Sequence, residues 1–351
     1  MPSSTQLETR LYRLRANGRA VLRSSGSRLL AVITGLAIGA SAWATEPFEL
    51  AERESLTVVV TDSGLGGLTV AADIARRAVS DRTHAAMNIV FYNALFDAET
   101  GYNSLPTRAE RVRIFNNALE DMGQRFEPDV ILVACNTLSV LLPDCAYAQE
   151  GAVPVLGIVE TGSLLFEETL AEHPDAIVLL FGTPVTVEDE SYLESWVEKG
   201  GDPERFVAQA CPGLTEFIER DFEGFETEMM ISSFVADAVA SLDKPPGTGV
   251  FASLNCTHYA YAAPIWETEI EAEGLEFLGL LNPNDRMADF LFEPRLHGRA
   301  ETPEVGVRFV TMVPISAEAV DSISRAIHPV SPLAAEALKN YELIPDLFPW
   351  D

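Results

Sequence analysis

Short apolar runs, many of them rich in β-branched residues, recur along the chain between segments whose apolar positions have helical spacing. The runs predict buried strands at 56–61, 88–92, 129–134, 153–158, 176–181 and 249–254. Helical periodicity is clear over 107–123 and 213–241. Because strands that alternate with helices form βαβ units, the pattern predicts an α/β fold with mostly parallel sheets covered on both faces.

The first of these runs ends abruptly in polar and glycine residues, in the stretch "VVVTDSGLGGLTV" of residues 58–70. The residues concerned are Asp62, Ser63, Gly64, Gly66 and Gly67. Glycines in such a turn allow backbone amides to approach an anionic group closely. The turn lacks the Lys-Ser/Thr of a Walker loop and the GxGxxG spacing of dinucleotide folds, so a small carboxylate is the expected guest. A simple N-cap is the alternative role for Asp62.

Two cysteines occupy matching positions in a weak internal repeat. "VILVACNT" places Cys135 after a predicted strand, and "VFASLNCTH" places Cys256 after another, with His258 two residues later. Two similar halves that face each other would put one thiol on each wall of a shared cleft. A thiol at a helix N-terminus is favoured as thiolate, and a nearby histidine can serve as an acid or an orienting donor. The alternatives are a buried structural cysteine and a structural histidine.

The first 44 residues are predicted to be a signal peptide. Six arginines precede the apolar stretch "LLAVITGLAIGA", and Ala42-Trp43-Ala44 follows as a small-x-small cleavage site. We therefore expect a periplasmic or secreted protein that starts near Thr45. An uncleaved leader would instead act as a membrane anchor.

Charge narrows the set of partners. The chain carries 53 acidic and 24 basic residues, a formal net charge of −29, and loss of the arginine-rich leader would make it more acidic still. Nucleic acid and anionic membrane surfaces would repel such a protein, so neither is expected as a partner. A solvated acidic surface, typical of salt-exposed proteins, is the plain interpretation.

The remaining cysteines, Cys145 and Cys211, lack a comparable setting and are interpreted as structural. Four cysteines in an exported chain would ordinarily suggest disulfides, and a disulfide between Cys135 and Cys256 is kept as a further hypothesis. A metal site is not expected, because the cysteines are dispersed and no second histidine lies near His258.

Six motifs give the chain a specific resemblance. They are "TDSGLGGLTV", "VACNTLSV", "VLGIVETG", "TPVTVEDESY", "ACPGL" and "LNCTHY". Their order and approximate spacing resemble those of glutamate racemase and the wider cofactor-independent aspartate/glutamate racemase superfamily, over roughly residues 56–320. The resemblance implies two pseudo-symmetric, doubly wound parallel-sheet domains with the active site at their interface. The implied division gives residues 45–152 and 265–330 to the first domain, 153–264 to the second, and 331–351 to a C-terminal tail.

The resemblance also implies a role for each matching residue. Cys135 and Cys256 act as acid and base on opposite faces of the substrate Cα, with Asp62 assisting the first thiol and His258 the second. Glu160, in "GIVETG", matches an acid that orients groups near the second cysteine. The positions that match those holding the amino and carboxylate groups of the substrate are Ser63, Asn136, Thr137, Thr186 and Thr257.

One loop departs from the pattern of the family. Glutamate racemases typically carry a Pro-Tyr-Gly-x-Lys/Arg-Ser loop after the second strand, whereas this chain reads "DAETGYNSLPTRAERV" at 97–112. Tyr102 and Ser104 are the candidates to contact the substrate, and Arg108 is the candidate for the missing basic residue. An exposed loop without a role in binding is the alternative, so the side-chain specificity stays open.

The resemblance implies a reaction without pyridoxal phosphate, metal or other cofactor, and no lysine of the mature chain has a setting that suggests a Schiff base. The expected substrate is a small amino acid, glutamate first, with aspartate or a broader set as the alternative. An exported amino-acid-binding protein that keeps the racemase fold is a hypothesis of a different class. The oligomeric state is left open, with a homodimer as one option.

Overall fold

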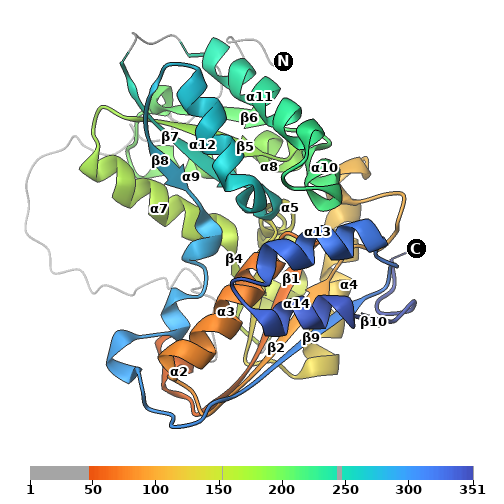
Figure 1. Cartoon of the computed structure of the whole chain (residues 1–351). Coiled ribbons are helices and arrows are strands. Elements are labelled where there is room, and N and C mark those ends of the chain that lie inside the picture. Colours follow the sequence, from red (N-terminus) through yellow and green to blue (C-terminus); the bar gives the residue numbers. More distant parts are fainter. Residues whose placement is uncertain (1–46, 152, 243–246, 351) are drawn as a thin grey trace, which may run out of the picture. The chain divides into compact units, whose positions relative to one another are not determined.

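All six apolar runs lie in β-strands of the computed structural model, which describes residues 47–151, 153–242 and 247–350. One sheet has the order β10-β9-β2-β1-β3-β4 and the other the order β6-β5-β7-β8, and the paired strands are parallel (Figure 1). The strands are β1 (Ser55–Asp62), β2 (Ala86–Asn93), β3 (Val130–Val133), β4 (Val155–Gly157), β5 (Ile177–Gly182), β6 (Phe206–Ala210), β7 (Gly249–Asn255), β8 (Glu276–Leu281), β9 (Glu304–Thr311) and β10 (Glu342–Leu343). The predicted α/β fold with parallel sheets is confirmed.

Helices cover both faces of each sheet. They are α2 (Pro47–Glu52), α3 (Leu68–Asp81), α4 (Arg108–Phe126), α5 (Asn136–Ser139), α6 (Ala146–Glu150), α7 (Ile158–Glu172), α8 (Pro184–Asp189), α9 (Ser191–Glu198), α10 (Leu214–Arg220), α11 (Phe225–Ala240), α12 (Ala263–Ala272), α13 (Ala317–Ile327) and α14 (Pro332–Lys339). Short 3-10 helices are η1 (Tyr102–Ser104), η2 (Leu142–Asp144), η3 (Pro203–Arg205), η4 (Thr257–Ala262), η5 (Pro283–Asp285), η6 (Asp289–Leu291) and η7 (Pro294–Leu296). The single helical segment expected at 213–241 is two helices, because the extended backbone at Asp221 ends α10 before Gly224 begins α11.

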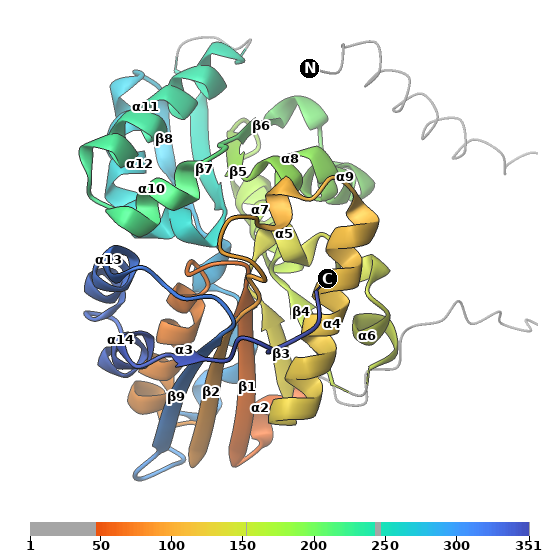
Figure 2. The same ribbon diagram turned by 90° about the vertical axis from the view of Figure 1, so that its right-hand side faces the viewer.

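Side-chain alternation along the central strand explains why both faces of the first sheet are apolar. Val58 and Val60 of β1 pack in one cluster with residues of α3, α13 and α14, whereas Val59 packs in another with residues of α4. Figure 2 shows α3, α13 and α14 on one side of this sheet and α4 and α6 on the other. The second sheet is covered in the same way, with α10, α11 and α12 on one face and α7 and α9 on the other.

The chain passes from one sheet to the other and back. After β4 it continues through α7 to the second sheet, and after β8 it returns through η5, η6 and η7 to β9. We define residues 47–157 and 283–350 as the first lobe and residues 158–282 as the second lobe. The described residues all belong to one compact unit.

These lobes divide the chain at residues that differ from the expected domain limits of 153 and 265. β4 still pairs with β3 of the first sheet, and β8 pairs with β7 of the second. The segment expected to be a C-terminal tail from 331 contains α14, which packs in the core of the first lobe, and β10, which extends its sheet. The run at 153–158 predicted β4, but an apolar run does not show which sheet its strand joins, and the two-residue β10 has no apolar run that could predict it.

The expected signal peptide at 1–44 and its cleavage site lie outside the described residues. Within the described ranges, no helix combines the length and the apolar character that crossing a membrane requires.

Candidate active site

A cavity of about 350 Å³ lies at the carboxyl ends of strands from both sheets, the usual place for ligand sites in parallel α/β folds. Asp62 ends β1, Cys135 follows β3, Thr183 follows β5, and Cys256 follows β7; all four residues line the cavity. The two thiols predicted to share a cleft therefore do so, one from each lobe, and each cysteine is only 5% exposed.

The surroundings of the first thiol hold its proton. The hydroxyl of Ser63 lies 3.2 Å from Cys135 Sγ. Burial, and then the negative charge of Asp62, raise the pKa of the Cys135 thiol well above its ordinary value, and the hydrogen bonds with Ser63 only partly offset this. Cys135 is thus a proton donor at neutral pH.

Asp62 joins the two lobes across the cavity. Its Oδ2 accepts hydrogen bonds from the Gly67 amide and from the Thr257 hydroxyl, both at 2.6 Å. Gly67, the residue before α3, has no side chain to cap that helix, and the carboxylate of Asp62 bonds to its amide. The carboxylate is 1% exposed and satisfied by neutral donors, which is how a buried charge is retained without a cationic partner.

A chain of polar groups follows the second thiol. Cys256 Sγ lies 3.8 Å from His258 Nδ1, and His258 Nε2 lies 2.6 Å from Glu219 Oε1. Burial alone lowers the pKa of His258, but hydrogen bonds with Cys256 and Glu219 and the charges of both outweigh it, so the pKa is raised well above its ordinary value. The imidazole is therefore cationic at neutral pH, and a cationic imidazole beside a thiol favours the thiolate.

The carboxylate in this chain is not the one expected from the resemblance. Glu160 lies exposed on α7 and lines a different surface depression, with Thr161 and Leu164 among its neighbours, so the position predicted for it is wrong. The acid beside His258 is Glu219 of α10, eight residues after Cys211 in the "ACPGL" motif. The spacing from that motif is the signal in the sequence that could have identified it.

The predicted substrate-binding residues differ in how close they come to the cavity. Ser63, Asn136, Thr137 and Thr257 line it. Thr186 does not: its hydroxyl lies 3.0 Å from that of Thr183, which lines the cavity and was missed by the sequence analysis. The Thr183 hydroxyl also lies 2.8 Å from that of Thr137 in the first lobe. Thr186 thus contacts Thr183 and not the cavity itself.

Two buried polar groups at the cavity have no partner within the described part of the chain. Asn136 Oδ1 accepts a hydrogen bond of 2.5 Å from Tyr192, but its Nδ2 has none. The hydroxyl of Tyr102 has none either, although Tyr102 is 1% exposed. Buried groups of this kind ordinarily have partners, so both point to a ligand that supplies them.

The loop that departs from the family pattern contributes to the cavity without its basic residue. Tyr102 and Ser104 line the cavity, and Ser104 is exposed. Arg108 is held elsewhere: it forms ion pairs with Asp144 and Asp189 and donates to the Val140 carbonyl at 2.6 Å. Arg108 therefore does not replace the missing cation, because two carboxylates outside the cavity already bind it.

Gly66 of the first turn makes room for the second lobe. A Cβ on Gly66 would overlap Thr257 Oγ1 and the His258 amide. The carboxylates that accept from the amides of this turn belong to the protein: the Leu65 amide donates to Glu219 at 3.1 Å and the Gly67 amide to Asp62. The turn thus helps to join the two lobes, and the small carboxylate ligand expected at these amides stays a prediction.

The other cysteines are structural, as interpreted. Cys145 is buried away from the cavity, where burial raises the pKa of its thiol to about 12, and Cys211 is buried in the core. All four cysteines are free, which contradicts the disulfide hypothesis for Cys135 and Cys256. The described residues contain no cluster of three or more His, Cys, Asp or Glu side chains suited to a metal ion.

Comparison with known proteins gives this arrangement a family. The chain is 29% identical over 230 residues to a glutamate racemase of Aquifex pyrophilus, covering 64% of this chain and 76% of that one. It is 28% identical over 201 residues to a glutamate racemase of Chlorobium phaeobacteroides, covering 57% and 66%. A crystal structure of glutamate racemase from Francisella tularensis, in complex with D-glutamate, matches with a TM-score of 0.58 and 21% identity, covering 79% and 94%. No family model matches the chain.

The fold is the two-domain α/β architecture of glutamate racemases. By sequence and fold the chain is related to the amino-acid racemases of the aspartate/glutamate racemase superfamily, as the resemblance predicted.

Proposed function

We propose that this protein is a cofactor-independent amino-acid racemase that inverts Cα by proton transfer between two thiols. The observation that carries the proposal is that Cys135 and Cys256 line one cavity from opposite lobes, the first with a raised pKa and the second beside His258, whose pKa is raised. Inversion by proton transfer requires one base and one acid on opposite faces of the same carbon.

In one direction of the reaction, Cys256, beside His258, acts as the base and removes the Cα proton, while Cys135, whose pKa is raised, delivers its own proton to the opposite face. The Cα–H bond breaks as the S–H bond of Cys256 forms, and the S–H bond of Cys135 breaks as the new Cα–H bond forms. By family resemblance, Cys256 acts on the L enantiomer and Cys135 on the D enantiomer.

The intermediate with negative charge at Cα is the difficult species, and it needs hydrogen-bond donors fixed in advance. Asn136 Nδ2 is a donor without a partner in the described structure, and Ser63 and Thr137 line the same cavity. These groups would bind the substrate carboxylate, where charge accumulates when the proton leaves. Asp62 would face the ammonium group of the substrate. The buried walls exclude water and strengthen each of these interactions.

Glutamate is the first substrate to examine, because the relatives with matching sequences are named glutamate racemases and the Francisella protein was solved with D-glutamate. Aspartate, or a broader set of amino acids, is the alternative. The size of the cavity, at the small end of the range of ligand pockets, suits one amino acid.

A screen of free amino acids in D₂O tests the reaction class. The proposal predicts Cα deuterium in at least one amino acid by NMR, together with formation of the opposite enantiomer. A Cys135→Ser/Cys256→Ser double variant is the control and should incorporate none. Saturable binding of an amino acid without any exchange would overturn the racemase and leave a binding protein with this fold.

A further inference from the structure

The lining of the active-site cavity is strongly acidic. Five of its side chains are carboxylates: Asp62, Asp97, Glu99, Glu216 and Glu219. None of the residues lining it is Lys or Arg, and its single histidine, His258, is bound to Glu219. A cleft lined by charges of one sign concentrates their field and selects ligands of the opposite sign.

The carboxylates fall into two groups by position. Asp62 and Glu219 are engaged deep in the site, with Thr257 and with His258 respectively. The other three, which we define as the mouth carboxylates, are Asp97, Glu99 and Glu216. Glu99 and Glu216 are exposed, and Asp97 is partly exposed.

The mouth carboxylates lack a cation. Hydrogen bonds from the Thr100 hydroxyl, then from the Glu99 and Thr100 amides, lower the pKa of Asp97, so it is ionised at neutral pH. Glu216 accepts one hydrogen bond of 2.9 Å, from the Thr215 hydroxyl. In the described ranges none of the three forms an ion pair with Lys, Arg or His.

The position of the unpartnered donors orients the substrate. The amide of Asn136 and the hydroxyl of Tyr102 belong to buried residues beside Cys135, where they mark the place of a bound ligand. Because the reacting Cα must lie between Cys135 and Cys256, its carboxylate and amino groups occupy this buried end. The side chain of the substrate then extends toward the mouth carboxylates.

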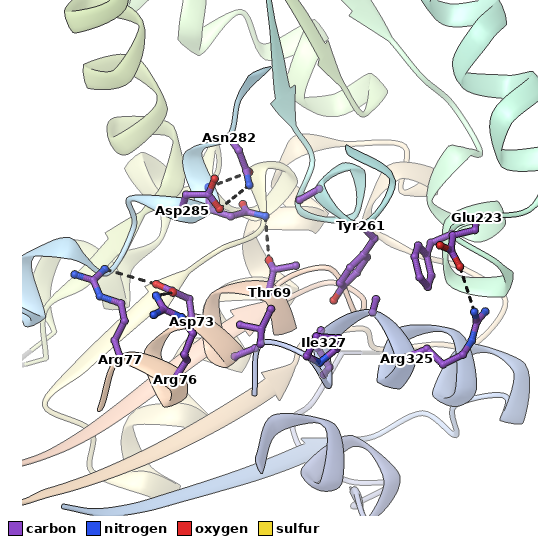
Figure 3. Close-up of a pocket in the computed structure, with 17 residues that line it drawn as sticks. Thr69, Asp73, Arg76, Arg77, Glu223, Tyr261, Asn282, Asp285, Arg325 and Ile327 are labelled. Carbon is purple, nitrogen blue, oxygen red and sulfur yellow. Dashed lines mark hydrogen bonds and ion pairs between the residues drawn. The ribbon is translucent and has the colours of Figure 1, made fainter. Parts of the chain in front are cut away.

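A second cavity holds acidic side chains in different surroundings. A cavity of about 930 Å³ lies between α3, η4 and α13, and its lining contains three arginines (Figure 3). There Arg76 pairs with Asp73, and Arg325 pairs with Glu223. Asp73 and Glu223 at that cavity thus meet arginines, whereas Asp285, which also lines it, accepts from Asn282. The mouth carboxylates have no arginine partner.

From the charge and orientation together we infer that the substrate carries a cationic side chain, as lysine, ornithine or arginine does. The inference rests on the proposed racemase function and names its substrate class. A side-chain carboxylate would meet Asp97, Glu99 and Glu216 with no cation to compensate, since Arg108 is bound to Asp144 and Asp189. A side-chain ammonium or guanidinium would be attracted by all three mouth carboxylates.

The experiment measures Cα deuterium exchange and racemisation of lysine, ornithine, arginine, glutamate, aspartate, glutamine and methionine at equal concentration. We expect kcat/KM for the best cationic amino acid to exceed that for glutamate by about tenfold or more. Faster reaction of glutamate, aspartate, glutamine or methionine would overturn the substrate class and leave the racemase standing. Absence of exchange with every amino acid would overturn the racemase itself, and the substrate class with it.

Charge variants test whether the mouth carboxylates cause the preference for a cationic amino acid. In Glu99→Gln/Glu216→Gln, the ratio of kcat/KM between the cationic amino acid and glutamine should fall about tenfold, while deuterium exchange into glutamine persists. Glu267→Gln, which removes an exposed charge on α12 away from the cavity, is the matched control and should leave the ratio unchanged. The ratio in the native protein should also fall as salt rises, because both mouth glutamates are exposed. A ratio that neither the double variant nor salt changes would overturn the assignment.

Discussion

The two halves of the active site present the same functional group in opposite surroundings. Cys135 is buried next to the negative charge of Asp62 and contacts the neutral hydroxyl of Ser63. Cys256 is equally buried but lies beside His258, which Glu219 helps to keep protonated. The comparison teaches that two identical side chains differ here because of their neighbours: one thiol lies beside a carboxylate and the other beside a histidine whose pKa is raised.

The asymmetry originates in the way the lobes meet. In the second lobe, His258 follows Cys256 in the chain. In the first lobe, Asp62 ends β1, the strand next to the one that precedes Cys135, and it also accepts a hydrogen bond from Thr257 of the second lobe. Each half-site therefore contains a group held by the other lobe: Glu219 accepts from Leu65, and Asp62 accepts from Thr257. Neither half-site is complete without the opposite lobe.

Replacing either thiol should have the largest effect. Cys135→Ser and Cys256→Ser should each lower racemisation by about 10²–10⁴-fold, because serine is a far weaker acid and base near neutral pH. With a substrate that carries a leaving group on Cβ, Cys135→Ser should still eliminate from the L form and Cys256→Ser from the D form, since elimination needs only one base.

The measurement is the keto acid released from each enantiomer by each variant. Cys145→Ala, which alters a buried thiol away from the cavity, is the control and should keep both activities. Loss of elimination from both enantiomers in both folded variants would show that the assignment of one thiol to each face is wrong.

Neutralising Glu219 should slow the reaction of the L enantiomer. In Glu219→Gln the imidazolium of His258 loses its anionic partner, so its pKa falls and less Cys256 thiolate is present. We expect kcat for the L enantiomer to fall about tenfold, and the basic limb of its pH profile to move to lower pH.

Glu160→Gln is the matched control, because that carboxylate lies outside the cavity, and it should retain the native rates and profile. Equal losses in the two variants would contradict the role of Glu219 as a positioning residue.

The pH dependence should differ between the two enantiomers. The D enantiomer needs Cys135 as thiolate, and the pKa of this thiol is raised, so its thiolate fraction grows only as pH rises above the ordinary thiol range. We therefore expect kcat for the D form to rise toward alkaline pH, whereas kcat for the L form, which needs Cys135 protonated, does not; kcat/KM stays equal for the two enantiomers, because their free energies are equal. Superimposable kcat profiles, measured with each enantiomer at saturation under initial-rate conditions, would remove the proposed difference between the thiols.

The smallest effect is expected for Tyr102→Phe, a change in the part of the cavity that contains Cys135. The hydroxyl has no partner in the described structure, so its removal should leave the free energy of unfolding within about 1 kcal/mol of the native value or raise it. KM should rise several-fold, because the substrate loses a hydrogen-bond partner. Thermal unfolding and steady-state kinetics test the two expectations separately, and an unchanged KM would show that this hydroxyl does not contact the substrate.

Much of the fold could be predicted because β1, β3 and β7 are continuous apolar runs buried on both faces. The sequence pattern did not predict β6 and β9, because neither strand is a continuous buried apolar run. β6 is half-buried at the edge of its sheet, and the first part of β9 alternates between partly buried and exposed residues, including Arg308. Such strands acquire their partners from the fold rather than from a run of apolar residues.

The same distinction applies to the site. Cys135 and Cys256 stand out because each follows an apolar run in a similar context. Glu219 is one of 53 acidic residues, and only the packing of α10 against the first turn brings it to His258. The acidity of the mouth likewise arises from one loop and a helix that are distant in sequence, so spacing alone could not reveal it.

The central claim is that each thiol serves one face of the substrate, and early deuterium incorporation tests it most directly. In D₂O the thiols carry solvent deuterium, so a reaction started from one enantiomer should place deuterium at Cα of the product. The recovered substrate should keep its original hydrogen during the first few per cent of conversion, measured by NMR or mass spectrometry after separation of the enantiomers. Deuterium in the recovered substrate as early as in the product, or product that keeps the original hydrogen, would contradict the two-thiol account.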